Sequence, residues 1–195
     1  PSYNMAGVPL NPVIYVRYNE ELDAAVLGSA TIRLQNVTDG WVDVASTASL
    51  DSSGRILQVM PDSLLEAGKR YYLRLESITD TDGDVSRNYG TYFNTAADAV
   101  EDDRQAMVLA ISPPDGETGV GVNVRYAARF DERMNPLSFD NDNSQRFNAQ
   151  FSEDNRVMRY ERLGTLDALT EITESVPVLV DPAGNSVVAI STTFT

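Results

Sequence analysis

The residues best suited to chemistry are the carboxylates of the run Asp80-Thr81-Asp82-Gly83-Asp84. Carboxylates that alternate around a glycine are typical of loops that bind calcium through oxygen ligands. The run lacks the rest of an EF-hand loop, because Thr91 occupies the twelfth position, where a bidentate glutamate is expected. The simpler interpretation is a turn in which Asp80 caps backbone N–H groups and Gly83 supplies a positive φ. The candidate calcium ligands are Asp80, Asp82 and Asp84.

A second candidate for calcium is the acidic run formed by Glu101, Asp102 and Asp103, between the two halves of the chain. Calcium bound there would stiffen a joint between domains. A run of exposed acids is more often a solvated linker. The sequence requires no cofactor, and calcium is the one ion for which it offers a set of ligands.

Catalytic chemistry is largely excluded by what the chain lacks. It contains no cysteine and no histidine, which removes thiol nucleophiles, Ser-His pairs, thiolate zinc sites and histidine-ligated metals. The pairs Asp131-Glu132 and Asn19-Glu20 do not converge on one substrate atom, because neighbouring strand residues point to opposite faces. The single lysine, Lys69, is expected in a turn, which argues against Ser-Lys catalysis. We therefore predict that the chain is not an enzyme.

The single tryptophan, Trp41, is a candidate interaction residue. With Val42 and Val44 it would form an exposed aromatic platform for a carbohydrate, so a glycan partner stays open. The simpler interpretation places Trp41 in the core of its domain or over the edge of that core. In the pair Tyr71-Tyr72, one ring is expected to be buried and the other exposed.

The charge of the chain limits its partners. The net charge is -14 and the sequence pI is about 4.2, so the surface repels nucleic-acid phosphates and anionic lipid headgroups. We predict no nucleic-acid partner and no membrane insertion, since no apolar run approaches the roughly 20 residues of a spanning helix. The chain starts at Pro1 without a basic-then-apolar leader. We expect that an export signal was removed or lies outside this sequence.

An internal repeat organises the chain. Residues 7–11 align with residues 119–123 at an offset of 112, and residues 17–20 align with residues 129–132 at the same offset. Residues 55–57 align with residues 156–158 at an offset of 101. The second copy is therefore eleven residues shorter, and we expect the missing residues between about 24 and 51 of the first copy.

The repeated segments alternate as β-strands do. In residues 12–18, Ile14, Val16 and Tyr18 share one face and Arg17 lies on the other. The counterparts of the first three in the second copy are also apolar, which marks the buried face. Turns rich in Gly, Asp and Asn separate the β-rich runs. Further strands are expected at residues 31–34, 41–44, 57–59, 71–75, 89–93, 176–180 and 187–193, with one short helical turn at residues 62–67.

Many short strands, regular turns and no convincing long helix indicate a β-sandwich. We predict an all-β fold of two tandem immunoglobulin-like β-sandwich domains. The expected boundaries are residues 1–97 for the first domain, 98–106 for an acidic linker and 107–195 for the second, shorter domain.

The same segments resemble the bacterial Ig-like repeat family of secreted and surface proteins. Members open with a proline, an acidic turn, Gly-Val and Asn, then a strand that ends in an acidic residue. They continue with a leucine, a glycine turn and a strand-opening tyrosine, and they close with an Asp-x-x-Gly-Asn turn and Phe-Thr. The matching residues here are Pro114-Asp115-Gly116-Glu117-Thr118-Gly119-Val120-Gly121-Val122-Asn123, Phe130-Asp131-Glu132, Leu65-Glu66-Ala67-Gly68-Lys69-Arg70-Tyr71, Asp181-Pro182-Ala183-Gly184-Asn185 and Phe194-Thr195. In the second copy, Leu169 replaces the turn glycine and Ile172 the tyrosine, and in the first copy Asp84 replaces the turn asparagine. The resemblance implies a spacer, adhesive or assembly module and transfers no catalytic residues.

An apolar run precedes the second copy and is expected to form its first strand: Met107, Val108, Leu109, Ala110 and Ile111. By the offset of 112, its counterpart in the first copy would lie before residue 1, so the first domain is expected to lack its first strand. One interpretation is that the chain is a fragment of a longer array, or that the strand is dispensable. The other is that a neighbouring subunit donates the strand and links protomers into a fibre. The five residues are therefore candidates for strand pairing.

We predict a non-catalytic structural or adhesive module of an extracellular or cell-surface assembly, with a fibre subunit joined by strand donation as one form. Its partners would be other protein subunits or copies of itself. One alternative is a calcium-dependent adhesin segment that binds a surface or a glycan. The other is a non-catalytic accessory module of a larger secreted enzyme.

Overall fold

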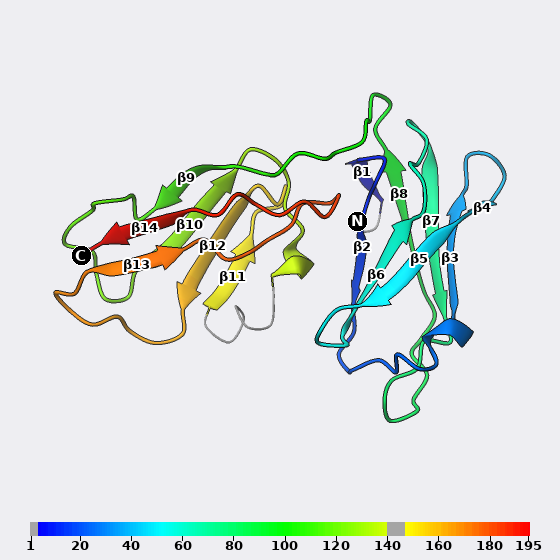
Figure 1. Ribbon diagram of the computed structural model, residues 1–195, viewed down its shortest axis with the longest axis horizontal. Coiled ribbons are helices and arrows are strands. Elements are labelled where there is room, and N and C mark those ends of the chain that lie inside the picture. Colours follow the sequence, from blue (N-terminus) through cyan, green and yellow to red (C-terminus); the bar gives the residue numbers. More distant parts are fainter. Residues whose placement is uncertain (1–3, 140–146) are drawn as a thin grey trace. The chain divides into compact units, whose positions relative to one another are not determined.

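The computed structural model describes residues 4–139 and 147–195, and the chain divides into two compact units, residues 1–103 and residues 104–195 (Figure 1). We name these units domain 1 and domain 2. Each has its own cluster of buried apolar side chains. The helices in the described ranges are two single 3-10 turns, η1 (Leu27–Ser29) and η2 (Pro136–Ser138), and neither is long or apolar enough to cross a membrane.

Domain 1 is built from two sheets, with strand orders β1-β8-β7-β3-β4 and β2-β6-β5. Its strands are β1 (Met5–Val8), β2 (Ile14–Arg17), β3 (Thr31–Asn36), β4 (Val42–Val44), β5 (Ser46–Leu50), β6 (Ile56–Pro61), β7 (Arg70–Glu76) and β8 (Tyr89–Thr95). Neighbouring strands are antiparallel, except that β1 runs parallel to β8. The inner faces of both sheets contribute to one core, for example through Leu57 and Leu73, which are both fully buried.

Domain 2 repeats this plan with fewer strands. Its sheets have the orders β11-β12-β10-β9 and β13-β14. The strands are β9 (Val108–Ser112), β10 (Arg125–Phe130), β11 (Phe147–Phe151), β12 (Val157–Arg162), β13 (Ile172–Ser175) and β14 (Ser191–Phe194). Tyr126, Met158 and Phe194 bring both sheets into one buried cluster. The predicted fold class, all-β with two tandem immunoglobulin-like β-sandwiches, is confirmed.

The repeat seen in the sequence recurs in the hydrogen bonds. Tyr18 N donates to Arg55 O at 2.8 Å in domain 1, and Phe130 N donates to Arg156 O at 2.8 Å in domain 2. These pairs are related by the two offsets of the sequence alignment. The predicted buried face is also confirmed, because Ile14 is fully buried, Val16 and Tyr18 pack against the core, and Arg17 on the other face is exposed.

The eleven-residue difference falls where β3 and β4 lie in domain 1. Among the described residues of domain 2, no strand pairs with β13 as β3 pairs with β7 in domain 1. Among the described residues, the hairpin of β3 and β4 therefore occurs in domain 1 alone, and its position agrees with the gap expected between about residues 24 and 51.

Three local predictions are wrong in whole or in part. The strand expected at residues 187–193 begins only at Ser191. Residues 62–67 form turns and irregular backbone instead of a helical turn, since Leu65 N is engaged by Leu10 O at 2.7 Å. Residues 176–180 contain one isolated bridge, from Val180 to Ser186, and no strand. Conversely, β1, β5, β11 and β13 were not expected, because their short and partly polar segments lack clear alternation.

Candidate functional site

The outer face of the larger sheet of domain 1 carries three aromatic side chains in contact. Tyr72 of β7 and Tyr92 of β8 lie directly opposite each other, with ring centroids 4.5 Å apart. The Trp41 ring lies nearly perpendicular to both, at 5.6 Å and 78° from Tyr72 and at 6.4 Å and 71° from Tyr92. Edge-to-face contacts of this kind are favourable for aromatic rings. We name Trp41, Tyr72 and Tyr92 the aromatic face.

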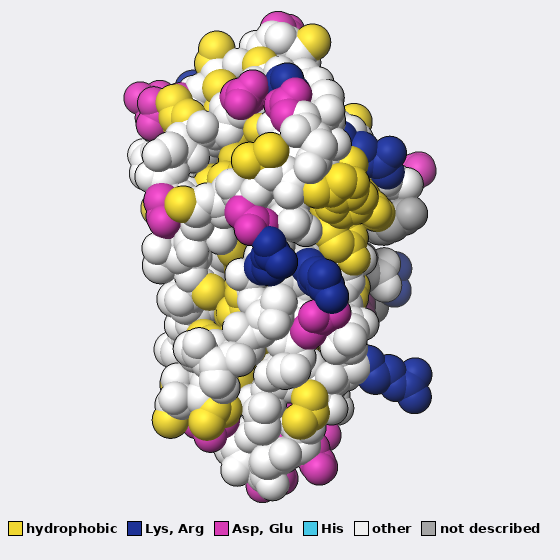
Figure 2. Space-filling model, turned by 90° about the vertical axis from the view of Figure 1, so that its right-hand side faces the viewer, with side chains coloured by type: hydrophobic (Ala, Val, Ile, Leu, Met, Phe, Trp, Pro, Cys, Tyr) yellow, Lys and Arg dark blue, Asp and Glu magenta, His cyan; other side chains and the backbone are white. Residues whose placement is uncertain are grey.

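The aromatic face lies outside the core. Trp41 is 48% exposed, so the interpretation that placed it in the core is wrong. The reason is the alternation of β7: Tyr71 points inward and stacks on Phe93, and Tyr72 therefore points outward. Figure 2 faces the side of Figure 1 on which β3, β4 and β7 lie, and hydrophobic side chains gather there beside basic and acidic ones.

The turn between β3 and β4 holds Trp41 in an unusual backbone conformation. Gly40 has φ +90° and Trp41 has φ +65°. Glycine adopts positive φ freely, whereas a bulky side chain there costs about 1–2 kcal/mol. Since half of the Trp41 side chain is exposed, burial does not explain why this turn position carries a tryptophan.

Gly90 makes room for the second ring of the aromatic face. It lies opposite Arg74 in the pairing of β7 with β8, and a Cβ atom at this position would be 1.9 Å from the Tyr72 hydroxyl oxygen. Any other residue at position 90 would therefore displace the Tyr72 ring, so the glycine allows this ring to extend over β8.

Polar side chains border the aromatic face. Together with the three rings, Gln35, Arg74 and Glu76 line a hollow of about 510 Å³. Gln35 Nε2 donates to Asp43 Oδ1 at 3.0 Å, and Arg74 forms an ion pair with Glu76 at 2.7 Å. The hollow therefore offers aromatic surfaces beside planar hydrogen-bonding groups, and its one cation and one anion neutralise each other.

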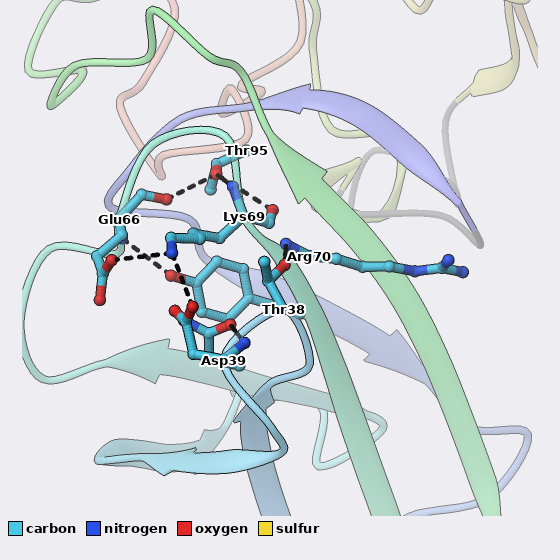
Figure 3. Close-up of polar contacts among 8 residues, drawn as sticks. Thr38, Asp39, Glu66, Lys69, Arg70 and Thr95 are labelled. Atoms are coloured by element: carbon cyan, nitrogen blue, oxygen red, sulfur yellow. Dashed lines mark hydrogen bonds and ion pairs between the residues drawn. The ribbon is translucent and has the colours of Figure 1, made fainter.

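The single lysine stabilises the same end of domain 1 through a polar cluster (Figure 3). Lys69 Nζ lies 2.8 Å from Asp39 Oδ1 and 3.6 Å from Glu66 Oε2, and the hydrogen bond from Lys69 lowers the pKa of Asp39. The buried Tyr71 hydroxyl accepts a 2.9 Å hydrogen bond from Glu66 N. Thr95 Oγ1 donates to Glu66 O at 2.7 Å. All these groups are engaged with one another, which accounts for them as structural residues.

The candidate calcium loop is folded as a turn. Asp80 Oδ1 accepts hydrogen bonds from the backbone N of Asp82 at 3.0 Å and of Asp84 at 2.9 Å, and Gly83 has φ +89°. The hydrogen bond from the Asp84 backbone lowers the pKa of Asp80, whereas a hydrogen bond with Asp80 raises the pKa of Glu20. These contacts account for Asp80 without a metal ion.

The second copy contains the same turn. Asp181 Oδ1 accepts from Ala183 N at 2.7 Å and from Asn185 N at 3.0 Å, and Gly184 has φ +94°. A carboxylate oxygen of Asp181 also lies within 4.8 Å of one of Glu132. The two domains thus share a capped turn next to a second acid, Glu20 in the first domain and Glu132 in the second.

The acidic run at the end of domain 1 is only partly solvated. Glu101 and Asp103 are exposed, but Asp102 is half-buried. Its backbone N donates to Asn11 Oδ1 and its carbonyl accepts from Asn11 Nδ2, both at 2.9 Å. Asn11, in the connection between β1 and β2, therefore fixes the C-terminal end of domain 1 to that connection.

The strand-pairing candidates lie at β9, on the outer side of β10. Ala128 pairs with Ile111 and Arg129 with Ala110 in this antiparallel ladder. In domain 1, the equivalent strand β2 is the terminal strand of its sheet, and no strand among residues 4–139 and 147–195 adds to its outer side.

Sequence reasoning singled out Trp41 and expected one exposed ring in the pair Tyr71-Tyr72, but it did not connect Tyr72 with Trp41 and it missed Tyr92 and Gly90. The outward position of Tyr72 follows from the alternation of β7. Its neighbour Tyr92 depends on the register between β7 and β8, which the sequence does not state.

Comparison with protein families gives one result. A family model described as Bacterial Ig-like domain matches residues 1–95. Domain 1 therefore belongs to this family, and the resemblance found in the sequence is confirmed. Comparison with curated protein sequences finds no match.

Several solved structures align with the chain at low similarity. The N-terminal part of the bacterial S-layer protein SbsC aligns over 98% of this chain and 43% of its own, with 9% identity and a TM-score of 0.40. Domains 1–6 of the same surface layer protein align over 97% and 31%, with 10% identity and a TM-score of 0.41. The titin fragment A168169 aligns over 98% and 93%, with 8% identity and a TM-score of 0.30. The chain spans less than half of the S-layer chains, and at these scores the similarity carries no information about function.

Proposed function

We propose that this chain is a non-catalytic structural and adhesive segment of an extracellular or cell-surface assembly of a bacterium. The observation that carries the proposal is the tandem of two sandwiches, each with its own core, of which the first belongs to the bacterial Ig-like family. Domains of this build act as rigid spacers whose surfaces and strand edges make contacts. The lack of cysteine and histidine agrees with a role without catalysis.

Surface location is tested on the bacterium that encodes the chain. Intact cells are treated with protease, and the chain is followed with an antibody against domain 1. We expect loss of the signal from intact cells, while a cytoplasmic control protein stays whole. Protection of the chain until the cells are lysed would contradict the proposal.

A neighbouring subunit is the proposed source of the strand that completes the sheet of β2. Tyr18 N donates to Arg55 O, just before β6, so by alternation the Arg17 N–H points to the outer side of β2. An added antiparallel strand would pair there as β9 pairs with β10. Repeated head to tail without closing into a ring, such contacts would give a filament.

Strand donation is tested with a labelled peptide of residues 105–113 and the full chain. Saturable binding by fluorescence anisotropy is expected, and Arg17→Pro should abolish it because proline removes the outward N–H. Arg17→Ala is the matched control and should bind normally. Peptide binding that survives Arg17→Pro, or no binding to the unmodified chain, would remove this part of the proposal and leave the surface location untouched.

A further inference from the structure

We propose that the aromatic face of domain 1 binds neutral pyranose rings of an oligosaccharide or polysaccharide chain. This inference rests on the β3–β7–β8 surface alone and does not depend on strand pairing at β2. The two proposals can therefore fail separately.

The first argument is the stacking surface. The face of an aromatic ring is electronegative and attracts the slightly positive C–H groups on the flat side of a sugar ring. The Tyr72 and Tyr92 ring centroids are 4.5 Å apart with the rings tilted by 37°, and the Trp41 ring lies nearly perpendicular to both. The Arg70 guanidinium lies over the Tyr92 ring, 4.5 Å from its centroid, so the most open of the three rings is Trp41, which is 48% exposed.

The second argument is the backbone strain at Trp41. A turn with φ +65° at this position favours glycine or asparagine. A residue that keeps an unfavourable backbone conformation without being buried points to a role for its side chain. Gly90 supports the same view, because the glycine leaves space for the Tyr72 ring beside Trp41.

The third argument is the polar border of the hollow. Gln35, Arg74 and Glu76 line it with the aromatic face. Planar amide, guanidinium and carboxylate groups can bind pairs of sugar hydroxyls, while a few polar groups beside apolar walls fix the orientation of a ligand. The ion pair of Arg74 and Glu76 leaves the hollow without a net charge of its own, which favours a neutral ligand.

Other occupants fit less well. Nucleic acid also stacks on aromatic rings, but a chain of net charge -14 repels its phosphates. A purely apolar partner would leave Arg74 and Glu76 buried at the contact, where charged groups are costly. Sugar hydroxyls instead give these side chains hydrogen-bond partners.

Trp41 provides the assay, because it is the single tryptophan of the chain. Its fluorescence is titrated with hydroxyethyl cellulose, laminarin, mannan and glycol chitin, and with polygalacturonate as the acidic comparison. We expect a saturable change in Trp41 emission with at least one of the neutral or weakly charged glycans and none with polygalacturonate. Native gel electrophoresis in gels that contain the same polymers gives an independent readout through slower migration.

Three variants separate binding from folding. Trp41→Asn should lose retardation in the gel, with binding weakened about tenfold or more, while its thermal stability is kept or raised because asparagine tolerates positive φ. Gly90→Ala should weaken binding in the same way by displacing Tyr72. Val42→Thr, at the exposed neighbour of Trp41, is the matched control and should bind as the unmodified chain does.

Several outcomes would overturn the proposal. One is that no glycan of the panel changes the fluorescence or retards the protein in the gel. Another is that Trp41→Asn is retarded as strongly as the unmodified chain, and a third is that polygalacturonate binds better than the neutral glycans. A change in Trp41 emission that depends on protein concentration alone would instead assign the aromatic face to self-association and would also overturn it.

Discussion

Tyr71→Phe is expected to destabilise domain 1 by about 1 kcal/mol, the typical value of one hydrogen bond. The Tyr71 ring is 1% exposed and stacks on Phe93 at 5.5 Å, so phenylalanine keeps the packing and removes only the hydroxyl. That hydroxyl accepts the 2.9 Å hydrogen bond from Glu66 N. Because Glu66 is exposed, water can reach its N–H in the variant, and this keeps the loss near the value of a single bond.

The assay is urea unfolding followed by Trp41 fluorescence, which reports on domain 1 because Trp41 is the single tryptophan. With an m-value of about 1–3 kcal/mol/M, about 1 kcal/mol corresponds to a fall in the urea midpoint of about 0.3–1 M. Tyr72→Phe, which removes a hydroxyl from the outer face, serves as control and should change stability by less than about 0.5 kcal/mol. An unchanged midpoint for Tyr71→Phe would refute the assignment of this hydroxyl as a structural acceptor.

Three further predictions concern single positions. Tyr18→Phe should leave domain 1 as stable or raise its stability by up to about 1 kcal/mol, because the buried Tyr18 hydroxyl has no hydrogen-bond partner among the described residues and domain 2 has Phe130 there. Burial and Tyr89 raise the pKa of Tyr18 to about 12 in the folded domain. Because the unfolded value is about 10, deprotonation of Tyr18 lowers the stability of domain 1 as pH rises from about 10 towards 12. This alkaline loss of stability should be smaller in Tyr18→Phe, and a destabilised variant would contradict the prediction. Leu169→Gly should stabilise domain 2 by about 0.5–1 kcal/mol, since Leu169 is fully exposed with φ +58° where domain 1 has glycine; calorimetry measures it, and a lower Tm would contradict it. Asp80→Ala should lower the Tm of domain 1 and Asp80→Asn much less, because the amide oxygen can still accept from the backbone. Because the pKa of Asp80 is lowered in the folded domain, its ionised carboxylate stabilises domain 1 above the unfolded pKa of about 4, and this stabilisation is lost as pH falls. A chelator that lowers the Tm of the unmodified chain would show that a metal is involved.

Much of the fold could be predicted because it depends on local pattern. Alternation in residues 12–18 identified the face that Ile14 buries, and the apolar counterparts in the second copy agreed with it. The turn at Asp80 was predictable for the same reason, since an aspartate four residues before a turn end can cap its backbone. Short edge strands such as β1 and β13 were missed because their pairing, and not their own sequence, makes them strands.

Much less of the candidate site could be predicted. Trp41 attracted attention as the single tryptophan, but hydrophobicity alone favoured a place in the core. Its exposure depends on the turn between β3 and β4, which turns the ring towards the outer face of the sheet. The opposition of Tyr72 and Tyr92 depends on strand register, and a shift by one residue would have moved one of them to the other face.

The sequence by itself determined that the chain is a duplicated all-β protein without thiol or imidazole chemistry, because repeats, alternation and composition are local properties. Only the tertiary structure decided which rings meet on the outer face of domain 1 and which strands lie at the ends of their sheets. These features depend on contacts between residues far apart in the chain. Such contacts follow from the register and packing of whole sheets, which no short segment specifies alone.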